Sequence, residues 1–216
     1  MIEDIRSICE RILAQLPPDV QLTPEEQTRQ AREAELRGWL DAAPKIGVLS
    51  RYHEASLETG KPSPALDRVR QYLKDDDVRE GRCLVLAGPT GVGKTYAAVA
   101  ALRAQPQCAR RFLYFPALCG ALLDPGRRTD ALEAAKRVYL VVFDDFGTEY
   151  HKEGGLLQAF VDEIVWYREG AILPTIITTN LTVEQLRERL SDRIVDRLRG
   201  DWGDVFAATG PSLRVR

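Results

Sequence analysis

Apolar runs with the length of β-strands recur along the chain from residue 83 onward, and helical patterns separate them. Runs that are apolar throughout are typical of strands buried on both faces of a parallel sheet. The expected strands span residues 83–87, 110–116, 138–143, 172–179 and 205–208. Strands that alternate with helices predict an α/β fold with a doubly wound parallel sheet, whose ligand binds at the carboxyl ends of the strands.

The pattern before this alternation is different. Residues 2–16 place their apolar side chains on one helical stripe, and Pro17 and Pro18 end it. Thr23 and Glu26 have the spacing of a capping box, so a second, mostly polar helix is expected to run from there toward Leu40. Two readings of the first helix remain open: it docks on its own domain, or it binds a partner.

Residues 44–63 are irregular, with proline and glycine interrupting any helical period. The predicted organisation is therefore a helical N-terminal extension for partner binding at 1–43, a linker at 44–63 and an α/β core at 64–216.

Composition narrows the class of protein. The 216 residues are 44% hydrophobic and 29% charged, and no apolar run approaches the length of about 18 residues expected of a membrane helix. The acidic N-terminus is not a signal peptide, and the scattered Cys9, Cys83, Cys108 and Cys119 fit reduced thiols in a cytoplasmic protein. With a net charge of −2, contact with nucleic acid requires a local basic patch.

The strand at 83–87 leads into a phosphate-binding loop. Its sequence, GPTGVGKT, matches the spacing G-x-x-x-x-G-K-[ST] at every fixed position, and a helix follows it. Glycines let backbone N–H groups turn toward a phosphate, Lys94 is expected to reach the β and γ phosphates, and Thr95 is expected to offer its hydroxyl to Mg²⁺. The nucleotide-binding residues expected here are Gly88, Pro89, Thr90, Gly91, Val92, Gly93, Lys94 and Thr95.

Polar residues follow two other strands. Asp144 is expected to hold Mg²⁺ beside Thr95, and Asp145 to deprotonate the water that attacks the γ-phosphate, with Glu149 as the alternative base. Asn180 ends the next strand, where its amide can fix the same water or simply cap a turn.

Two groups of basic residues are candidates for further roles. Arg193 and Arg197 lie four apart on one helix face and either stabilise a transferring phosphoryl group in a neighbouring subunit or form a solvated basic face. Arg127, Arg128, Lys136 and Arg137 are the densest basic group between the second and third strands, and can contact the phosphates of a nucleic acid without reading its bases.

Together these segments resemble the AAA+ ATPases of the helicase-loader group typified by DnaC and DnaI, with their relative IstB, a transposition helper. GPTGVGKT resembles Walker A, VVFDDFGTE resembles Walker B, TIITTNLT resembles sensor 1, SDRIVDRLRG resembles the arginine-finger box, and GPSLRVR resembles sensor 2. The resemblance implies a P-loop AAA+ sheet with a truncated lid, Arg197 as the preferred finger, and Arg214 as the sensor 2 arginine. It places the segment 117–137 where the group has a helical insertion that faces single-stranded DNA.

The resulting expectation is a cytoplasmic ATPase that uses ATP and Mg²⁺, forms a nucleotide-dependent homo-oligomer on single-stranded DNA and helps load a replicative DNA helicase. Alternatives are a transposition helper that acts on duplex DNA with a transposase, a small-molecule kinase with the same loop, and a nucleotide-dependent adaptor that barely hydrolyses ATP. No membrane association is expected.

Overall fold

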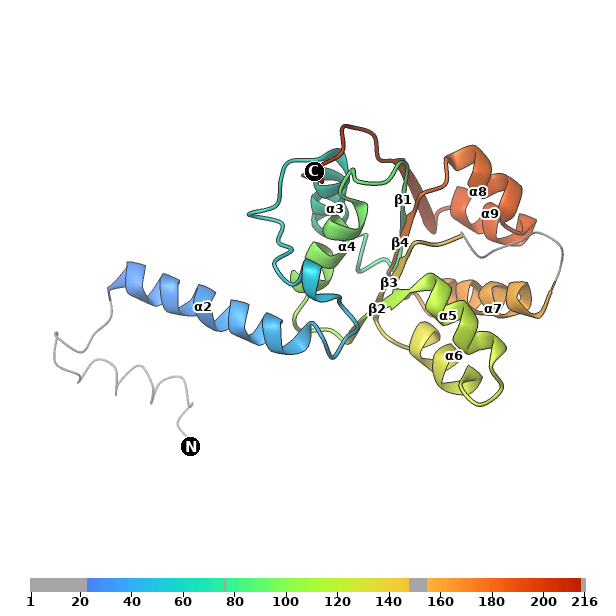
Figure 1. Ribbon diagram of the computed structural model, residues 1–216, viewed down its shortest axis with the longest axis horizontal. Helices are drawn as coiled ribbons and strands as arrows, with labels where there is room; N and C mark the ends of the chain where they lie inside the picture. The colour runs from blue at the N-terminus through green and yellow to red at the C-terminus, as the bar shows by residue number, and fades with distance from the viewer. Residues whose placement is uncertain (1–22, 76, 148–154, 215–216) are drawn as a thin grey trace, which may run out of the picture. The chain divides into compact units, whose positions relative to one another are not determined.

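The computed structural model describes residues 23–75, 77–147 and 155–214 (Figure 1). The chain divides into two compact units, residues 1–41 and 42–216. The helix expected at 2–16 lies outside the described residues. The capping box is formed as predicted: Thr23 N–H donates to Glu26 Oε2 (2.8 Å), and Glu26 N–H donates to Thr23 Oγ1 (3.3 Å). It starts α2 (Pro24–Ala42), whose side chains are mostly exposed.

Five parallel strands form one sheet in the described part of the second unit, in the order β2-β3-β4-β1-β5. Cys83 in β1, the strand between β4 and β5, lies opposite Thr175 on one side and Gly203 on the other. The strands are β1 (Cys83–Ala87), β2 (Arg110–Tyr114), β3 (Leu140–Asp144), β4 (Thr175–Thr179) and β5 (Gly203–Ala207). Because β1, β3 and β4 are buried at every position, the apolar runs mark the centre of the sheet as predicted.

Helices cover both faces of the sheet, with α3 and α4 on one face and α5 to α9 on the other (Figure 1). Their bounds are α3 (Pro64–Lys74), α4 (Lys94–Arg103), α5 (Phe115–Leu123), α6 (Arg128–Lys136), α7 (Leu156–Gly170), α8 (Val183–Arg189) and α9 (Asp192–Arg199), with a short 3₁₀ turn at Ser50–Tyr52. Alternation along β1 supplies both layers: Cys83, Val85 and Ala87 belong to the core beneath α5 to α9, so Leu84 and Leu86 point to the opposite face.

Two strands begin later than the apolar pattern predicts, at Leu140 and Thr175, and Arg168 explains the difference. This arginine of α7 is fully buried. Its guanidinium donates to the carbonyl oxygens of Val138 (2.9 Å), Tyr139 (2.9 Å) and Pro174 (2.8 Å), the residues before the two strands. Ile172 has a left-handed backbone (φ 55°), which also separates the end of α7 from β4.

Residues 44–63, expected to be a linker, lie within the second unit. Val48 and Ala55 are buried there, and the carbonyl oxygen of Ile46 accepts a hydrogen bond from the N–H of Phe112 in β2 (2.8 Å). The segment lacks helical periodicity because it follows the surface of the core.

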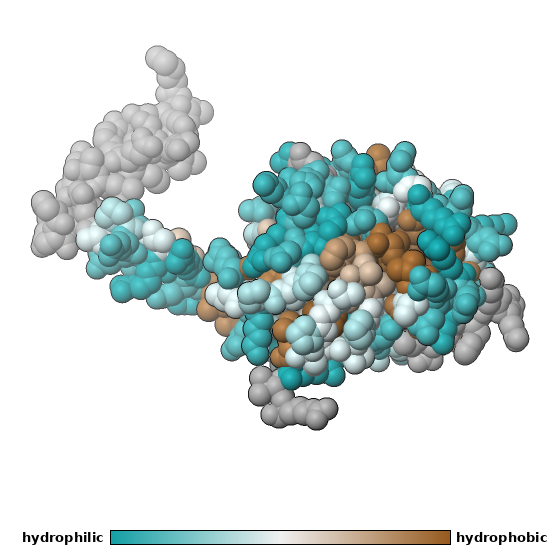
Figure 2. Space-filling view, turned by 90° about the horizontal axis from the view of Figure 1, so that it is seen from above, coloured by the Kyte–Doolittle hydropathy of each residue, from teal (hydrophilic) through white to brown (hydrophobic). Residues whose placement is uncertain are grey.

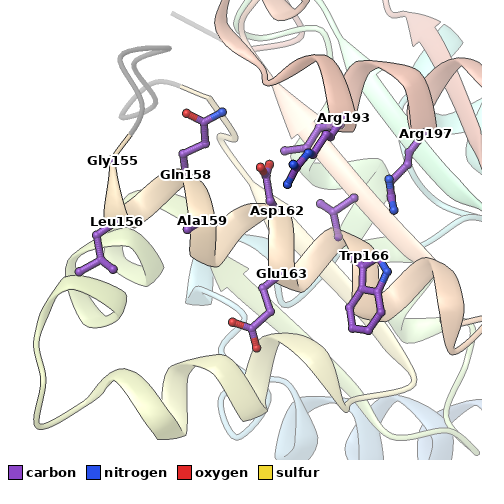
Figure 3. A pocket seen from close by; sticks show the side chains of 11 residues that line it. Gly155, Leu156, Gln158, Ala159, Asp162, Glu163, Trp166, Arg193 and Arg197 are labelled. Atoms are coloured by element: carbon purple, nitrogen blue, oxygen red, sulfur yellow. The ribbon is translucent and has the colours of Figure 1, made fainter.

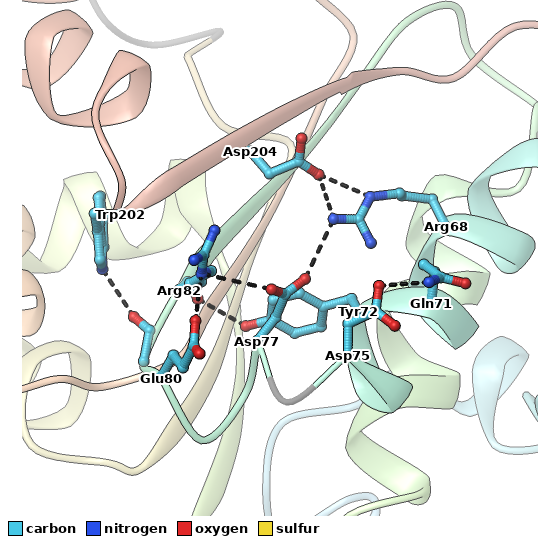
Figure 4. Close-up of polar contacts among 10 residues, drawn as sticks. Arg68, Gln71, Tyr72, Asp75, Asp77, Glu80, Arg82, Trp202 and Asp204 are labelled. Carbon is cyan, nitrogen blue, oxygen red and sulfur yellow. Dashed lines mark hydrogen bonds and ion pairs between the residues drawn. The ribbon is translucent and has the colours of Figure 1, made fainter.

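A polar cluster joins α3 to the edge strand β5 (Figure 4). Arg68 donates from Nε to Asp204 Oδ2 (2.8 Å), and its Nη2 lies 3.3 Å from Asp77 Oδ2. Trp202 Nε1 donates to the carbonyl oxygen of Gly81 (2.9 Å). These contacts fix β5 against the rest of the sheet. They thereby also fix the start of the C-terminal segment, residues 208–214, which follows β5.

The face of the second unit seen in Figure 2 is mainly hydrophilic, with apolar residues gathered near its middle. None of the helices in the described ranges is long and apolar enough to cross a bilayer.

Candidate functional site

The phosphate loop joins β1 to α4, as the motif predicts. Gly91 (φ 90°) and Gly93 (φ 95°) have left-handed backbones that other residues adopt at a cost. A Cβ on Gly91 would lie 2.4 Å from Ser212 Oγ, and Leu213 N–H donates to the carbonyl oxygen of Gly91 (2.9 Å). The C-terminal segment therefore packs directly on the loop.

Lys94 is buried at the start of α4. Its ammonium donates to the carbonyl oxygens of Gly88 (2.8 Å) and Pro89 (2.7 Å) and to Asn180 Oδ1 (3.1 Å). Burial lowers the pKa of Lys94, while Asp145 and Asp144 oppose this shift. A cation is thus held at the centre of the loop, where an anionic ligand is expected.

Thr95 and Asp144 are in direct contact. The Thr95 hydroxyl donates to Asp144 Oδ1 (2.7 Å), and the buried Thr178 hydroxyl of β4 donates to the same oxygen (2.7 Å). Since its proton is engaged by Asp144, the Thr95 oxygen keeps its lone pairs for a cation. A hydroxyl and a carboxylate are the hard oxygen donors that suit Mg²⁺, which takes its remaining ligands from water and phosphate.

Asp145 follows β3 with a left-handed backbone (φ 63°). Its carboxylate accepts a hydrogen bond from the Asn180 amide (2.6 Å), so the structure brings together the two strand ends that the sequence indicates. The alternative base, Glu149, lies outside the described residues.

These side chains border a cavity of 610 Å³, within the usual range of about 300–1,000 Å³ for ligand sites. Arg214 lines it, as the resemblance implies. The residues that line it from outside the predicted set are Leu49, Arg51, Tyr52, Thr59, Lys61, Ser63, Tyr96, Tyr114, Thr178 and Leu213. Most come from residues 49–63, a segment without a chemical motif, so the sequence patterns considered above did not point to them.

Arg193 and Arg197 lie elsewhere. They extend from α9 toward α7 and line a separate groove of 890 Å³ with Asp162, Glu163 and the exposed Trp166 (Figure 3). Arg197 Nε lies 2.5 Å from Glu169 Oε2, a charge contact without hydrogen-bond geometry. These arginines are not gathered with Lys94 and Asp145 around the cavity of their own chain.

The four basic residues between β2 and β3 divide into two kinds. Arg128 lies over the Phe160 ring (4.9 Å from its centroid), and Lys136 pairs with Glu163 Oε1 (2.7 Å). Arg127 is exposed, and Arg137 is largely exposed although it pairs with Glu133. Arg127 and Arg137 are therefore the more accessible to a polyanion.

Comparison with known families decides the identity. The family model described as IstB-like ATP binding protein matches residues 22–216. This chain belongs to the IstB-like ATP binding family. A search of curated proteins gives no match.

Solved structures agree with this assignment. The chain is 27% identical to a structure of the DnaC helicase loader, with a TM-score of 0.61, and the match covers 74% of this chain and 100% of that one. A structure of DnaI is 26% identical with a TM-score of 0.64, over 78% of this chain and 95% of that one. The replication initiator DnaA bound to AMPPCP and single-stranded DNA shares the fold at 20% identity, with a TM-score of 0.62, over 73% of this chain and 50% of that one.

The IstB-like chain is therefore an AAA+ ATPase of the DnaC and IstB group, as the motifs indicate. Its phosphate loop, buried lysine and cavity suit ATP, with Thr95 and Asp144 arranged to accept Mg²⁺ at the same end. The family assignment argues against the alternative that the chain is a small-molecule kinase.

Proposed function

We propose that this ATPase assembles head to tail on single-stranded DNA and assists the loading of a replicative DNA helicase in the cytoplasm. Free thiols at Cys83, Cys108 and Cys119 are in keeping with that compartment. Lys94 binds the β and γ phosphates, Thr95 and Asp144 hold Mg²⁺, and Asp145 activates the attacking water, with Glu149 as the alternative base. Asn180 positions that water, and Arg214 contacts the nucleotide from the C-terminal segment.

The observation that carries the proposal is the separation of the arginines from the cavity. Arg193 and Arg197 line a groove away from the cavity of their own chain, so these two arginines are better placed to act on a phosphoryl group in the cavity of a second copy. A contact of this kind, between two different surfaces of the same chain, builds rings or helical filaments. ATP would then stabilise the interface, and hydrolysis would release it.

Similarity to the DnaC and DnaI structures supports a helicase as the partner. Assembly on DNA is tested with fluorescently labelled single-stranded and duplex oligonucleotides, with and without ATP and the replicative helicase from the same organism. The proposal predicts ATP-dependent binding to the single strand and helicase recruitment, both lost in Lys94→Ala. ATP-dependent preference for duplex DNA would instead favour a transposition helper, the second candidate that the family name supports.

The contact with DNA is assigned to Arg127 and Arg137, with Arg128 and Lys136 packed behind them. Replacing Arg127 and Arg137 by alanine should weaken single-strand binding and reduce its salt dependence without changing the melting temperature, because both side chains are largely exposed. The matched pair Arg128→Ala and Lys136→Ala should lower the melting temperature, because each loses a contact with α7. An unchanged salt slope in the first variant would move the DNA site elsewhere.

The N-terminal extension, residues 1–43, is proposed to bind the helicase. Deleting residues 1–18 should leave ATP binding and thermal stability nearly intact while abolishing helicase recruitment. A large loss of melting temperature with recruitment retained would show instead that this segment serves its own fold.

A further inference from the structure

Thr178 of β4 connects the two adjacent aspartates of the site. Its hydroxyl donates to Asp144 Oδ1 (2.7 Å) and accepts a hydrogen bond from the backbone N–H of Asp145 (3.1 Å). The side chain is 2% exposed, so water does not readily replace either bond. A single buried hydroxyl therefore links the side chain of one acid to the backbone of the next.

Each of these bonds restrains a different degree of freedom. Asp144 Oδ1 accepts from both Thr95 and Thr178, which fixes the rotation of this carboxylate toward the loop. Asp145 has a left-handed backbone (φ 63°), which costs about 1 kcal/mol or more unless its surroundings support it. The bond to Thr178 is one such support, because it satisfies the N–H of the strained residue.

A second contact comes from the residue that follows β4. Thr178 lies near the end of β4 and Asn180 comes directly after that strand, and both side chains reach Asp145 at the end of β3. Asn180 holds the Asp145 carboxylate (2.6 Å) while Thr178 holds its backbone. The direction of the Asp145 carboxylate is thus restrained at the backbone by Thr178 and at the carboxylate oxygen by Asn180.

We propose that Thr178 is a positioning residue for ATP hydrolysis, which sets the magnesium-binding carboxylate and the attacking-water carboxylate relative to each other. The inference rests on the roles proposed above for Asp144 and Asp145. Thr178 makes no bond to Lys94 among the contacts of the described residues, so its loss should impair turnover and Mg²⁺ use more than nucleotide affinity.

The neighbouring Thr179 provides a matched control. Its hydroxyl is equally buried, donates to the carbonyl oxygen of Phe146 (2.7 Å) and accepts from Leu181 N–H (3.1 Å), but it contacts neither aspartate carboxylate. Thr178→Val and Thr179→Val therefore each remove one donated and one accepted hydrogen bond from adjacent buried positions.

The experiment measures basal ATPase activity without DNA or helicase, together with the Mg²⁺ dependence of binding of a fluorescent ATP analogue and the melting temperature. Thr178→Val should lower kcat by about 10-fold to 100-fold with less than about a threefold change in KM for ATP, and should raise the Mg²⁺ concentration needed for tight binding. Thr179→Val should lose comparable thermal stability but keep kcat within about threefold of the wild type. Thr178→Ser, which retains the hydroxyl, should restore most of the activity.

The inference is overturned if Thr178→Val reduces kcat no more than Thr179→Val does, or if Thr178→Ser fails to restore it. Asp145→Asn in the same assay distinguishes a failure of the proposed role of Asp145 from a failure of the positioning role of Thr178. If Asp145→Asn keeps the wild-type rate, the proposed role of Asp145 is wrong; if it is inactive while Thr178→Val is normal, only the positioning role fails.

Discussion

Lys94 and Asn180 are joined by a hydrogen bond of 3.1 Å from the lysine ammonium to the asparagine Oδ1. The amide nitrogen of the same asparagine donates to Asp145 Oδ1 (2.6 Å). Asn180 therefore lies between the cation expected to bind the phosphates and the acid expected to activate water. If Lys94 and Asp145 have the proposed roles, Asn180 couples the group that binds the phosphates to the group that activates water.

Replacing Asn180 by alanine should separate nucleotide binding from turnover. Lys94 keeps its two carbonyl contacts with the loop, so ATP affinity should fall by less than about fivefold. The value of kcat should fall by at least about 10-fold, because the Asp145 carboxylate loses the hydrogen bond from the Asn180 amide. Steady-state ATPase kinetics and titration with a fluorescent ATP analogue measure the two effects. A loss of ATP affinity with kcat unchanged would argue that Asn180 acts only on binding.

The identity of the base is tested by Asp145→Asn and Glu149→Gln. If Asp145 is the base, Asp145→Asn should bind ATP normally, hydrolyse it about 100-fold or more slowly and trap the ATP-bound assembly. Glu149→Gln should then retain most of the activity. The reverse result in single-turnover assays would assign the base to Glu149.

The buried ammonium of Lys94 predicts how ATP affinity depends on pH. Burial lowers its pKa below the ordinary value of 10.5, so in the free protein it loses its proton at a lower pH than an exposed lysine does. Phosphate binding favours the protonated form, so the affinity for ATP should fall as the pH rises from neutrality toward 10.5, the ordinary pKa of lysine.

Calorimetric titration across this range measures the slope. Lys94→Arg is the control. Whatever the affinity of this variant at neutral pH, its charge persists, so it should bind ATP about equally tightly at the lowest and the highest pH measured. A wild-type affinity that does not change over the same range would show that the Lys94 proton is not linked to binding.

Arg168 is expected to be the most costly of the buried polar residues to remove. Besides the carbonyls that precede β3 and β4, its guanidinium contacts those of Ala135 and Lys136 and the Thr175 hydroxyl. Arg168→Met would leave several buried acceptors unsatisfied and should lower the free energy of unfolding by about 3 kcal/mol or more. Arg199→Met, at an exposed position, should change it by less than about 0.5 kcal/mol. Denaturant unfolding measures both.

The sequence was most informative where local patterns determine structure. The centre of the sheet follows from its apolar runs because a strand buried on both faces carries few charged positions. The phosphate loop follows from glycines at positions where the backbone is left-handed. Asp144, Asp145 and Asn180 converge because parallel strands end at one edge of a sheet.

Other features depend on tertiary contacts that leave no periodic signal. Val138 and Tyr139 are apolar enough for a strand, but Arg168, a distant residue, binds their carbonyl groups. Residues 49–63 line the cavity through their place on the surface of the core rather than through a motif. The hydrogen bond between Thr178 and Asp145 N–H depends on the left-handed backbone of Asp145, which two adjacent aspartates in a sequence do not predict.

Hydrolysis between subunits is tested most directly by mixing two inactive variants. Asp145→Asn lacks the base and Arg197→Ala lacks the proposed finger, so each should be nearly inactive alone. In an equimolar mixture, about a quarter of the sites would combine an intact Asp145 with Arg197 from a neighbour, and the ATPase rate should recover to about a quarter of the wild-type value. Arg193→Ala, in the same groove, is the matched variant: it should stay active alone if Arg197 is the finger. A mixture no more active than its separate components, or an Arg197→Ala protein as active as the wild type, would contradict the account.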